Sequence, residues 1–92
     1  MGKRASIKIT GLVQGVFFRD HTRQKAQELG IKGWVRNEKD GSVSILAQGS
    51  KAGLDEFIEW CKKGPDSAKV ENVEVVWREP ADVMAGFEIS HY

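Results

Sequence analysis

The spacing of the apolar residues changes repeatedly along this chain, from every second residue to every third or fourth, and this alternation limits the fold more than any other feature. Residues 5–10 alternate, with Ile7 and Ile9 on one face, which is typical of a half-buried strand. From position 18 the spacing becomes helical, and one face is formed by Phe18, Thr22, Ala26 and Leu29. Gly30 is placed to end this helix. The first third of the chain therefore predicts a strand followed by a helix.

A hairpin is predicted after the first helix. Residues 32–37 favour a strand, and the polar segment 38–41 ends on Gly41, which is a typical hairpin turn. The returning strand alternates in the same way as the first, with one face formed by Val43, Ile45 and Ala47.

The second half of the chain repeats the change from helix to strand. Ser50 is a candidate N-cap, and the apolar stripe of the helix that follows consists of Leu54, Phe57, Ile58 and Cys61. Gly64 and Pro65 end that helix, residues 73–78 alternate as a strand, residues 79–86 form a loop, and residues 87–89 form a short closing strand. The predicted order is βαββαβ plus a short C-terminal strand. Two helices on one face of a mostly antiparallel sheet give an α+β two-layer sandwich, and 92 residues leave room for a single domain, 1–92.

Charge and composition exclude several classes of function. The formal net charge is only +1, which argues against a general nucleic-acid binder, and no apolar stretch approaches the ~20 residues that cross a bilayer. Residues 1–36 carry eight Lys or Arg against two acidic residues. Either this part of the chain holds a small anion, or folding intermixes the two halves and the asymmetry has no meaning. With one cysteine, Cys61, no internal disulfide is possible, and we expect a cytoplasmic protein.

The joint between the first strand and the first helix is the most informative site. Gly11 and Gly15 bracket a predicted turn, and Arg19 follows at the start of the helix. The first amides of a helix lack partners within it, so a curved run of them forms an anion cradle. A guanidinium beside such a cradle grips a phosphate through two parallel hydrogen bonds. The alternative is an ordinary strand–helix turn with an arginine on the surface.

Asn37 is the second unusual residue, because it ends a predicted strand just before the hairpin turn. If this strand lies beside the first strand in the sheet, Asn37 faces the anion cradle. A carboxamide both donates and accepts hydrogen bonds, so it can hold a water molecule without adding a negative charge that a phosphate would repel. The alternative is that Asn37 is a turn former.

Two segments resemble the signatures of the acylphosphatase family. Residues 11–19 read GLVQGVFFR, which matches G-x-V-Q-G-V-x-F-R at every fixed position. Residues 33–43 read GWVRNEKDGSV, with Gly49 beyond, and match the second signature of the family. The resemblance runs from about Ser6 to Ile89, although residues 68–85 are less distinctive.

The resemblance implies a fold, a reaction and a set of site residues. Members of this family have a ferredoxin-like sandwich and hydrolyse carboxyl–phosphate anhydrides to a carboxylate and inorganic phosphate, with no metal, no cofactor and no phosphoenzyme. Arg19 matches the phosphate-binding arginine, and Asn37 matches the asparagine that positions the attacking water. The backbone cradle corresponds to Gly15, Val16, Phe17 and Phe18. The expected partners are a small acyl phosphate and inorganic phosphate or a similar anion, with no nucleic acid and no membrane, and we expect a monomer.

Other phosphate chemistries lack their residues in this sequence. No Walker loop is present, Cys61 has no following arginine loop, and His21, His91 and Cys61 are too scattered for a metal site. His21 is close enough to Arg19 to be considered as a general acid, but a solvated helix position explains it as well. Two rival functions are an RNA-binding module, which lacks its aromatic pattern here, and an acylphosphatase-like domain that only binds anions or a protein.

Overall fold

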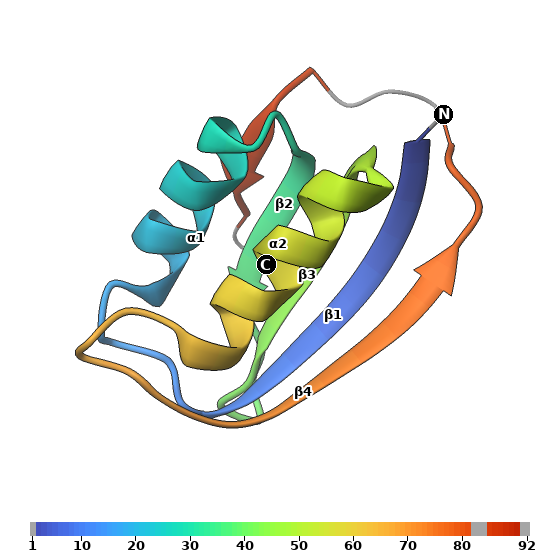
Figure 1. Cartoon of the computed structure of the whole chain (residues 1–92). Helices are drawn as coiled ribbons and strands as arrows, with labels where there is room; N and C mark the ends of the chain where they lie inside the picture. Colours follow the sequence, from blue (N-terminus) through green and yellow to red (C-terminus); the bar gives the residue numbers. More distant parts are fainter. Residues whose placement is uncertain (1, 82–84, 91–92) are drawn as a thin grey trace.

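The computed structural model describes residues 2–81 and 85–90, which form two helices and five strands. The elements in chain order are β1 (Gly2–Leu12), α1 (Phe18–Glu28), β2 (Lys32–Asn37), β3 (Val43–Ser50), α2 (Lys51–Lys63), β4 (Lys69–Arg78) and β5 (Phe87–Ile89). This is the predicted order, βαββαβ with a short closing strand. Figure 1 shows the two helices lying side by side on the sheet.

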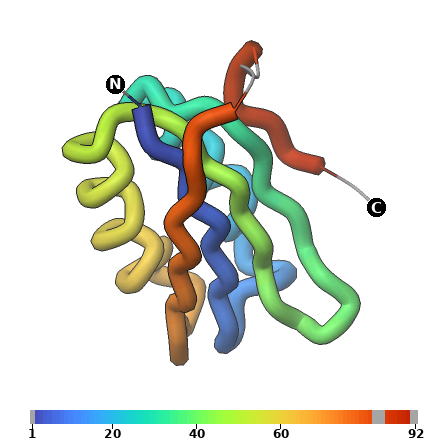
Figure 2. The backbone as a smooth tube through the Cα atoms, turned by 90° about the vertical axis from the view of Figure 1, so that its right-hand side faces the viewer, coloured from blue at the N-terminus to red at the C-terminus, as the bar shows by residue number. Residues whose placement is uncertain are grey.

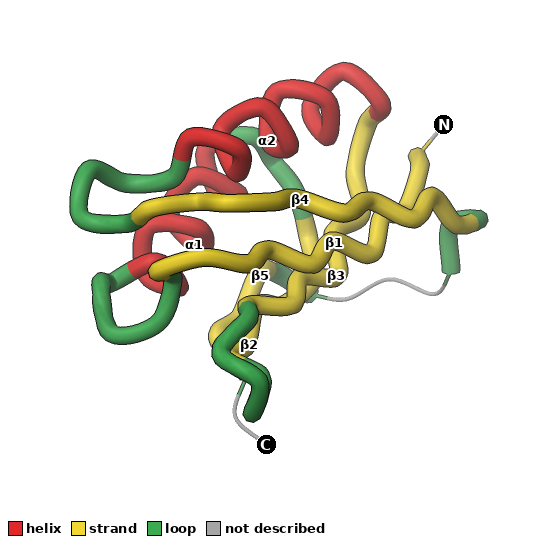
Figure 3. The backbone as a smooth tube through the Cα atoms, turned by 90° about the horizontal axis from the view of Figure 1, so that it is seen from below, coloured by secondary structure: helices red, strands yellow, loops and turns green. Residues whose placement is uncertain are grey.

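The strands form one sheet in the order β4-β1-β3-β2-β5. Three of the four pairings are antiparallel, and only β2 and β5 run parallel. Seen from below, both helices of the described residues lie on the same side of the strands (Figure 3). The predicted two-layer sandwich is therefore confirmed.

The first strand is longer than the alternation predicts. The expected turn over residues 11–15 is wrong in its first part, because Gly11 and Leu12 still pair with β4, opposite Val70 and Lys69. The register shifts between Thr10 and Gly11, and the strand continues beyond this irregularity. β1 therefore carries the chain directly to the start of the loop before α1.

The core lies between the helices and one face of the sheet. The predicted faces of β1 and β3 are buried, as Ile7 and Ile9 in β1 and Val43 and Ile45 in β3 illustrate. The predicted stripe of α2 is also completely buried, and Ser50 accepts the predicted capping hydrogen bond from the amide of Gly53 at 3.0 Å. In α1 the buried face consists of Phe18, Thr22 and Ala26. This packing fixes the start of α1 against the sheet.

The two edges of the sheet differ from each other. β4 is an edge strand along which the alternating burial weakens, and Trp77 near its end is 43% exposed, with the Lys51 ammonium 4.9 Å from its ring centroid. β5 forms the opposite edge beside β2 (Figure 2).

Part of the predicted loop 79–86, at residues 82–84, lies outside the described residues. Within the described part of the chain, neither helix is long and apolar enough to cross a membrane.

Candidate active site

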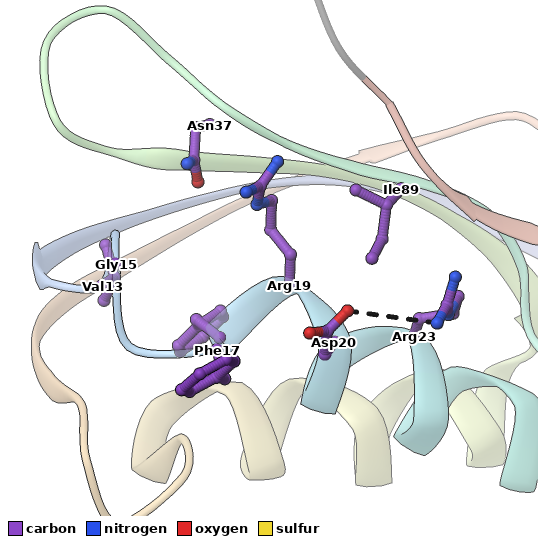
Figure 4. Close-up of a pocket in the computed structure, with 9 residues that line it drawn as sticks. Val13, Gly15, Phe17, Arg19, Asp20, Arg23, Asn37 and Ile89 are labelled. Carbon is purple, nitrogen blue, oxygen red and sulfur yellow. Dashed lines mark ion pairs between the residues drawn. The ribbon is translucent and has the colours of Figure 1, made fainter.

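An open pocket of about 550 Å³ lies at the N-terminal end of α1. Its walls come from the segment that joins β1 to α1, from the first turns of α1, and from the ends of β2 and β5. The residues that line it are Val13, Gly15, Phe17, Phe18, Arg19, Asp20, Arg23, Asn37 and Ile89. The pocket therefore brings together two residues that the sequence singled out separately, Arg19 and Asn37 (Figure 4).

The backbone of residues 15–18 forms a tight curve. Gly15 has a φ of 73°, and Phe17 adopts the left-handed region with φ 60° and ψ 22° as the residue before α1. A bulky residue rarely adopts this conformation unless the surrounding structure holds it there. Contacts of the loop with the rest of the molecule therefore hold Phe17 in this conformation.

The carbonyl groups of the loop are engaged, whereas its amides are not. The Ser67 hydroxyl donates to the carbonyl oxygen of Val16 at 2.8 Å, and the His21 amide donates to that of Phe17 at 3.1 Å. The His21 ring donates a second hydrogen bond to Phe17 through Nδ1 at 2.9 Å. No acceptor among the described residues takes a hydrogen bond from the amides of residues 15–20. These amides have the donor capacity that an anion requires.

The members of the predicted cradle do not all line the pocket. Gly15, Phe17 and Phe18 do, but the half-buried side chain of Val16 packs against the core instead. Phe17 is 71% exposed, whereas Phe18 is buried at 1% exposure and anchors the start of the helix. Phe18 and the carbonyl of Val16 therefore hold the loop to the rest of the molecule.

Arg19 stands in the first turn of α1 and is half-buried. In Figure 4 its guanidinium extends toward Asn37. It forms no ion pair with another described residue, whereas Asp20 and Arg23 approach each other at 4.0 Å between Oδ1 and Nη2. The positive end of the helix dipole, the free amides and the Arg19 guanidinium together favour an anion at this end of the pocket.

Asn37 reaches the pocket by a route that the sequence did not predict. The condition given for Asn37, that its strand lies beside the first strand, is not met, because β3 lies between β1 and β2. Asn37 nevertheless lines the pocket, because it is the last residue of β2. Its Oδ1 is buried and has no hydrogen-bond partner among the described residues. Since buried polar atoms are nearly always paired, this oxygen indicates a place for a water molecule or a ligand.

Gln14 connects the two halves of the site. Its Nε2 donates to the carbonyl oxygens of Glu38 at 2.7 Å and of Ser42 at 2.9 Å. Gln14 directly precedes the loop 15–18, and Glu38 directly follows Asn37. This side chain therefore fixes the loop to the strand end that carries Asn37. In the sequence, Gln14 stands out only as a letter of the first signature, because a long-range contact of this kind leaves no periodic signal.

The hairpin beyond Asn37 is held by its own polar contacts. Asp40 Oδ1 accepts hydrogen bonds from the Ser42 amide at 2.9 Å and the Ser42 hydroxyl at 2.6 Å, and Lys8 Nζ lies 3.2 Å from Oδ2. These contacts, the two to Ser42 first, lower the pKa of Asp40 to about 2. A hydrogen bond from Arg36 likewise lowers the pKa of Glu38. The turn is therefore locked by charged groups that lie outside the pocket.

His21 and Cys61, which were also considered from sequence, do not line the pocket. The exposed His21 supports the carbonyl of Phe17, as described above, and Cys61 is buried in the α2 stripe, where burial raises the pKa of its thiol. His91 lies outside the described residues. Across residues 2–81 and 85–90, no three side chains of the His, Cys, Asp or Glu type gather as a metal-binding group.

The match to a known family decides what kind of protein this is. The model of the family described as acylphosphatase matches residues 5–89. The chain belongs to the acylphosphatase family. Among its curated relatives, an acylphosphatase from Rubrobacter xylanophilus is 50% identical over 88 residues, which cover 95% of this chain and 79% of the relative. One from Salinibacter ruber is 49% identical, covering 95% of this chain and 92% of the relative.

The solved structures agree with this membership. A crystal structure of acylphosphatase from Bacillus subtilis superimposes with a TM-score of 0.94 at 34% identity, covering 99% of this chain and 100% of that one. The fold expected from the resemblance is thereby confirmed. As a member of the acylphosphatase family, the protein is an enzyme that hydrolyses acyl phosphates, and its substrate is a small molecule.

Proposed function

We propose that the pocket hydrolyses acyl phosphates by direct attack of water on phosphorus, without a metal ion and in a single-domain monomer. Arg19 and the backbone amides of Gly15, Val16, Phe17 and Phe18 bind the phosphoryl group, and Asn37 positions the water. The observation that carries the proposal is the buried, unpartnered Oδ1 of Asn37 in the same pocket as Arg19 and the loop.

The phosphoryl end is recognised by donors alone. The loop amides, which no described acceptor engages, and the Arg19 guanidinium all donate hydrogen bonds, and the phosphoryl oxygens accept them. These donors stabilise the charge that spreads over the equatorial oxygens in the transition state, where fixed dipoles are most effective. Catalysis then rests on this stabilisation and on the position of the water.

Asn37 has the right chemistry for the water. A water molecule that donates a hydrogen bond to Oδ1 keeps its own lone pairs free for phosphorus. The amide is also neutral, so it does not repel the phosphoryl group as a carboxylate would.

The reaction then needs no further acid or base from the protein. The water oxygen bonds to phosphorus while the bond between phosphorus and the acyl oxygen breaks, and the carboxylate leaves with the bonding electrons. Its conjugate acid has a pKa of about 4, so it leaves without a proton. One proton of the water passes to a phosphoryl oxygen and the other stays on the attacking oxygen, which gives the carboxylate and inorganic phosphate as products.

The test is hydrolysis of benzoyl phosphate in the presence of EDTA. Asn37→Ala should lower kcat by roughly 10²–10³-fold while inorganic phosphate still inhibits, because the water is lost but the anion site remains. Arg19→Ala should abolish phosphate inhibition as well as activity, since each charge-assisted contact contributes about 1.5–3 kcal/mol. Asn72→Ala and Arg78→Ala on β4 are matched controls that remove the same groups away from the pocket.

Two further results would refute the proposal. Hydrolysis in water labelled with a heavy oxygen isotope should place the label in phosphate, and label in benzoate would mean attack on carbon instead. Loss of activity in EDTA that a divalent metal restores would contradict the metal-free mechanism.

Sedimentation of the active protein at assay concentration should give the mass of one chain.

A further inference from the structure

The pocket is longer than the proposed phosphoryl chemistry requires. Figure 4 shows Asn37 and Arg23 at opposite ends, with Arg19 and Ile89 between them. Arg19 and Asn37 belong to the phosphoryl end. The opposite end, lined by Ile89 and Arg23, takes no part in the proposed phosphoryl chemistry. In the bound substrate, the acyl group extends away from the phosphoryl group, and this part of the pocket has room for it.

The spacing along α1 sets the dimensions of this second end. Arg23 follows Arg19 by four residues, so both lie on one face of the helix, about 6 Å apart along its axis. Ile89 comes from β5, which packs beside β2, and its half-buried side chain supplies an apolar wall between the two guanidinium groups. The second end of the pocket is therefore apolar at its entrance, and at its limit the Arg23 guanidinium stands beside the Asp20 carboxylate.

The Arg23 guanidinium is available to a ligand. Among the described residues its one ion-pair partner is Asp20, at 4.0 Å, and the side chains of Arg23 and Asp20 are 46% and 58% exposed. An ion pair that long between exposed groups is weak, so a ligand carboxylate can replace it. The planar guanidinium can then bind both oxygens of that carboxylate.

We propose that Arg23 is a specificity-determining residue that selects acyl phosphates whose acyl group ends in a carboxylate. The phosphoryl group occupies the Arg19 end, the carbon frame of the acyl group passes over Ile89, and the distal carboxylate binds Arg23. This inference rests on the proposed function, because it assumes that the phosphoryl group is held by Arg19 and the loop 15–18.

The experiment compares two rigid substrates of nearly equal size. In para-carboxybenzoyl phosphate the distal carboxylate cannot fold back on the anhydride, and para-carbamoylbenzoyl phosphate replaces it with a neutral amide. The corresponding meta pair covers a shorter reach. The measured quantity is the ratio of kcat/KM for the carboxylate substrate to that for the amide substrate, because any general effect on phosphoryl binding cancels in this ratio.

Wild type should prefer the carboxylate substrate in at least one pair, and Arg23→Gln should lower that preference roughly three- to tenfold, mainly through KM. This range lies between the effect of an exposed ion pair and that of a charge-assisted hydrogen bond. Arg23→Lys should retain part of the preference, and added salt should reduce it. Arg78→Gln on β4 removes the same charge far from the pocket and should keep the full preference.

The outcomes separate the two proposals. If wild type hydrolyses all four substrates and Arg23→Gln leaves both ratios unchanged, the role of Arg23 is overturned while the proposed function stands. If Arg78→Gln lowers the preference as much as Arg23→Gln, the effect is one of overall charge, and the role of Arg23 is again overturned. If wild type hydrolyses benzoyl phosphate but none of the four, this inference alone is overturned. If wild type hydrolyses neither benzoyl phosphate nor any of the four, the proposed function fails and this inference fails with it.

Discussion

Gln14→Met removes both hydrogen bonds that tie the loop 15–18 to the hairpin, while it keeps nearly the same side-chain length. The wild-type amide spans 2.7 Å to the carbonyl oxygen of Glu38 and 2.9 Å to that of Ser42. A typical hydrogen bond contributes about 0.5–1.5 kcal/mol net, so the loss of two predicts a decrease of about 1–3 kcal/mol in the free energy of unfolding. For a domain of this size, each 1 kcal/mol lowers Tm by about 4–8 °C.

The same substitution should also slow catalysis, because Gln14 is a positioning residue for Asn37. Glu38 is the next residue after Asn37, so releasing its carbonyl loosens the strand end that holds the proposed water. A displacement of about 1 Å in a catalytic group can cost up to about 10²-fold in rate. We expect kcat to fall roughly tenfold or more and KM to change little, because the phosphoryl donors on α1 and the loop remain.

The assays are equilibrium unfolding in urea and steady-state hydrolysis of benzoyl phosphate. Gln27→Met, on the exposed side of α1, is the matched control and should change stability by less than about 0.5 kcal/mol. The reasoning is refuted if Gln14→Met unfolds at the wild-type urea concentration with an unchanged m-value. A stability loss accompanied by a wild-type kcat would refute the positioning role alone.

Three further predictions concern the frame of the site. Gly33→Ala should lower the free energy of unfolding, measured in a urea titration, by more than about 3 kcal/mol. The φ of Gly33 is 144°, and a Cβ there would lie 1.8 Å from the Leu46 carbonyl oxygen. The control Gly86→Ala has open space around its Cβ and should be nearly neutral. Because the folded-state pKa of Asp40 is lowered to about 2, the stability that Asp40 contributes is full above about pH 4 and is lost as the pH falls toward 2. In a plot of the urea unfolding midpoint against pH, Asp40→Asn should therefore reduce the slope between these two pH values. An unchanged slope would contradict the assignment. His21→Ala should leave the shape of the kcat/KM pH profile unchanged, because the His21 ring does not line the pocket and bonds to the carbonyl of Phe17. If the substitution instead removed an inflection caused by a general base, His21 would be the proton acceptor.

The order of elements could be predicted because burial repeats with the period of each element. Ile7 and Ile9 in β1, and the complete stripe of α2, are buried as their spacing requires. The end of β1 could not be placed, because a glycine such as Gly11 fits either a turn or an irregular strand pair. Only the pairing with β4 decides between the two.

The chemistry of the site was accessible from sequence, but its assembly was not. Arg19 and Asn37 stood out because their residue types suit a phosphate and a water molecule. Their common pocket depends on strand order, which no local pattern encodes: β3, and not β2, lies beside β1. Gln14 and Ser67 were missed as braces because each bonds to a carbonyl more than twenty residues away.

The packing of Trp60 gives the enzyme an intrinsic optical reporter. Its indole lies 5.8 Å from the ring of Phe18, between centroids, and Phe18 lines the pocket. Trp34 and Trp77 lie elsewhere, beside the cationic groups of Arg36 and Lys51. With both of these replaced by phenylalanine, the emission of the remaining tryptophan would follow the arrival and departure of an anion in real time, without a label.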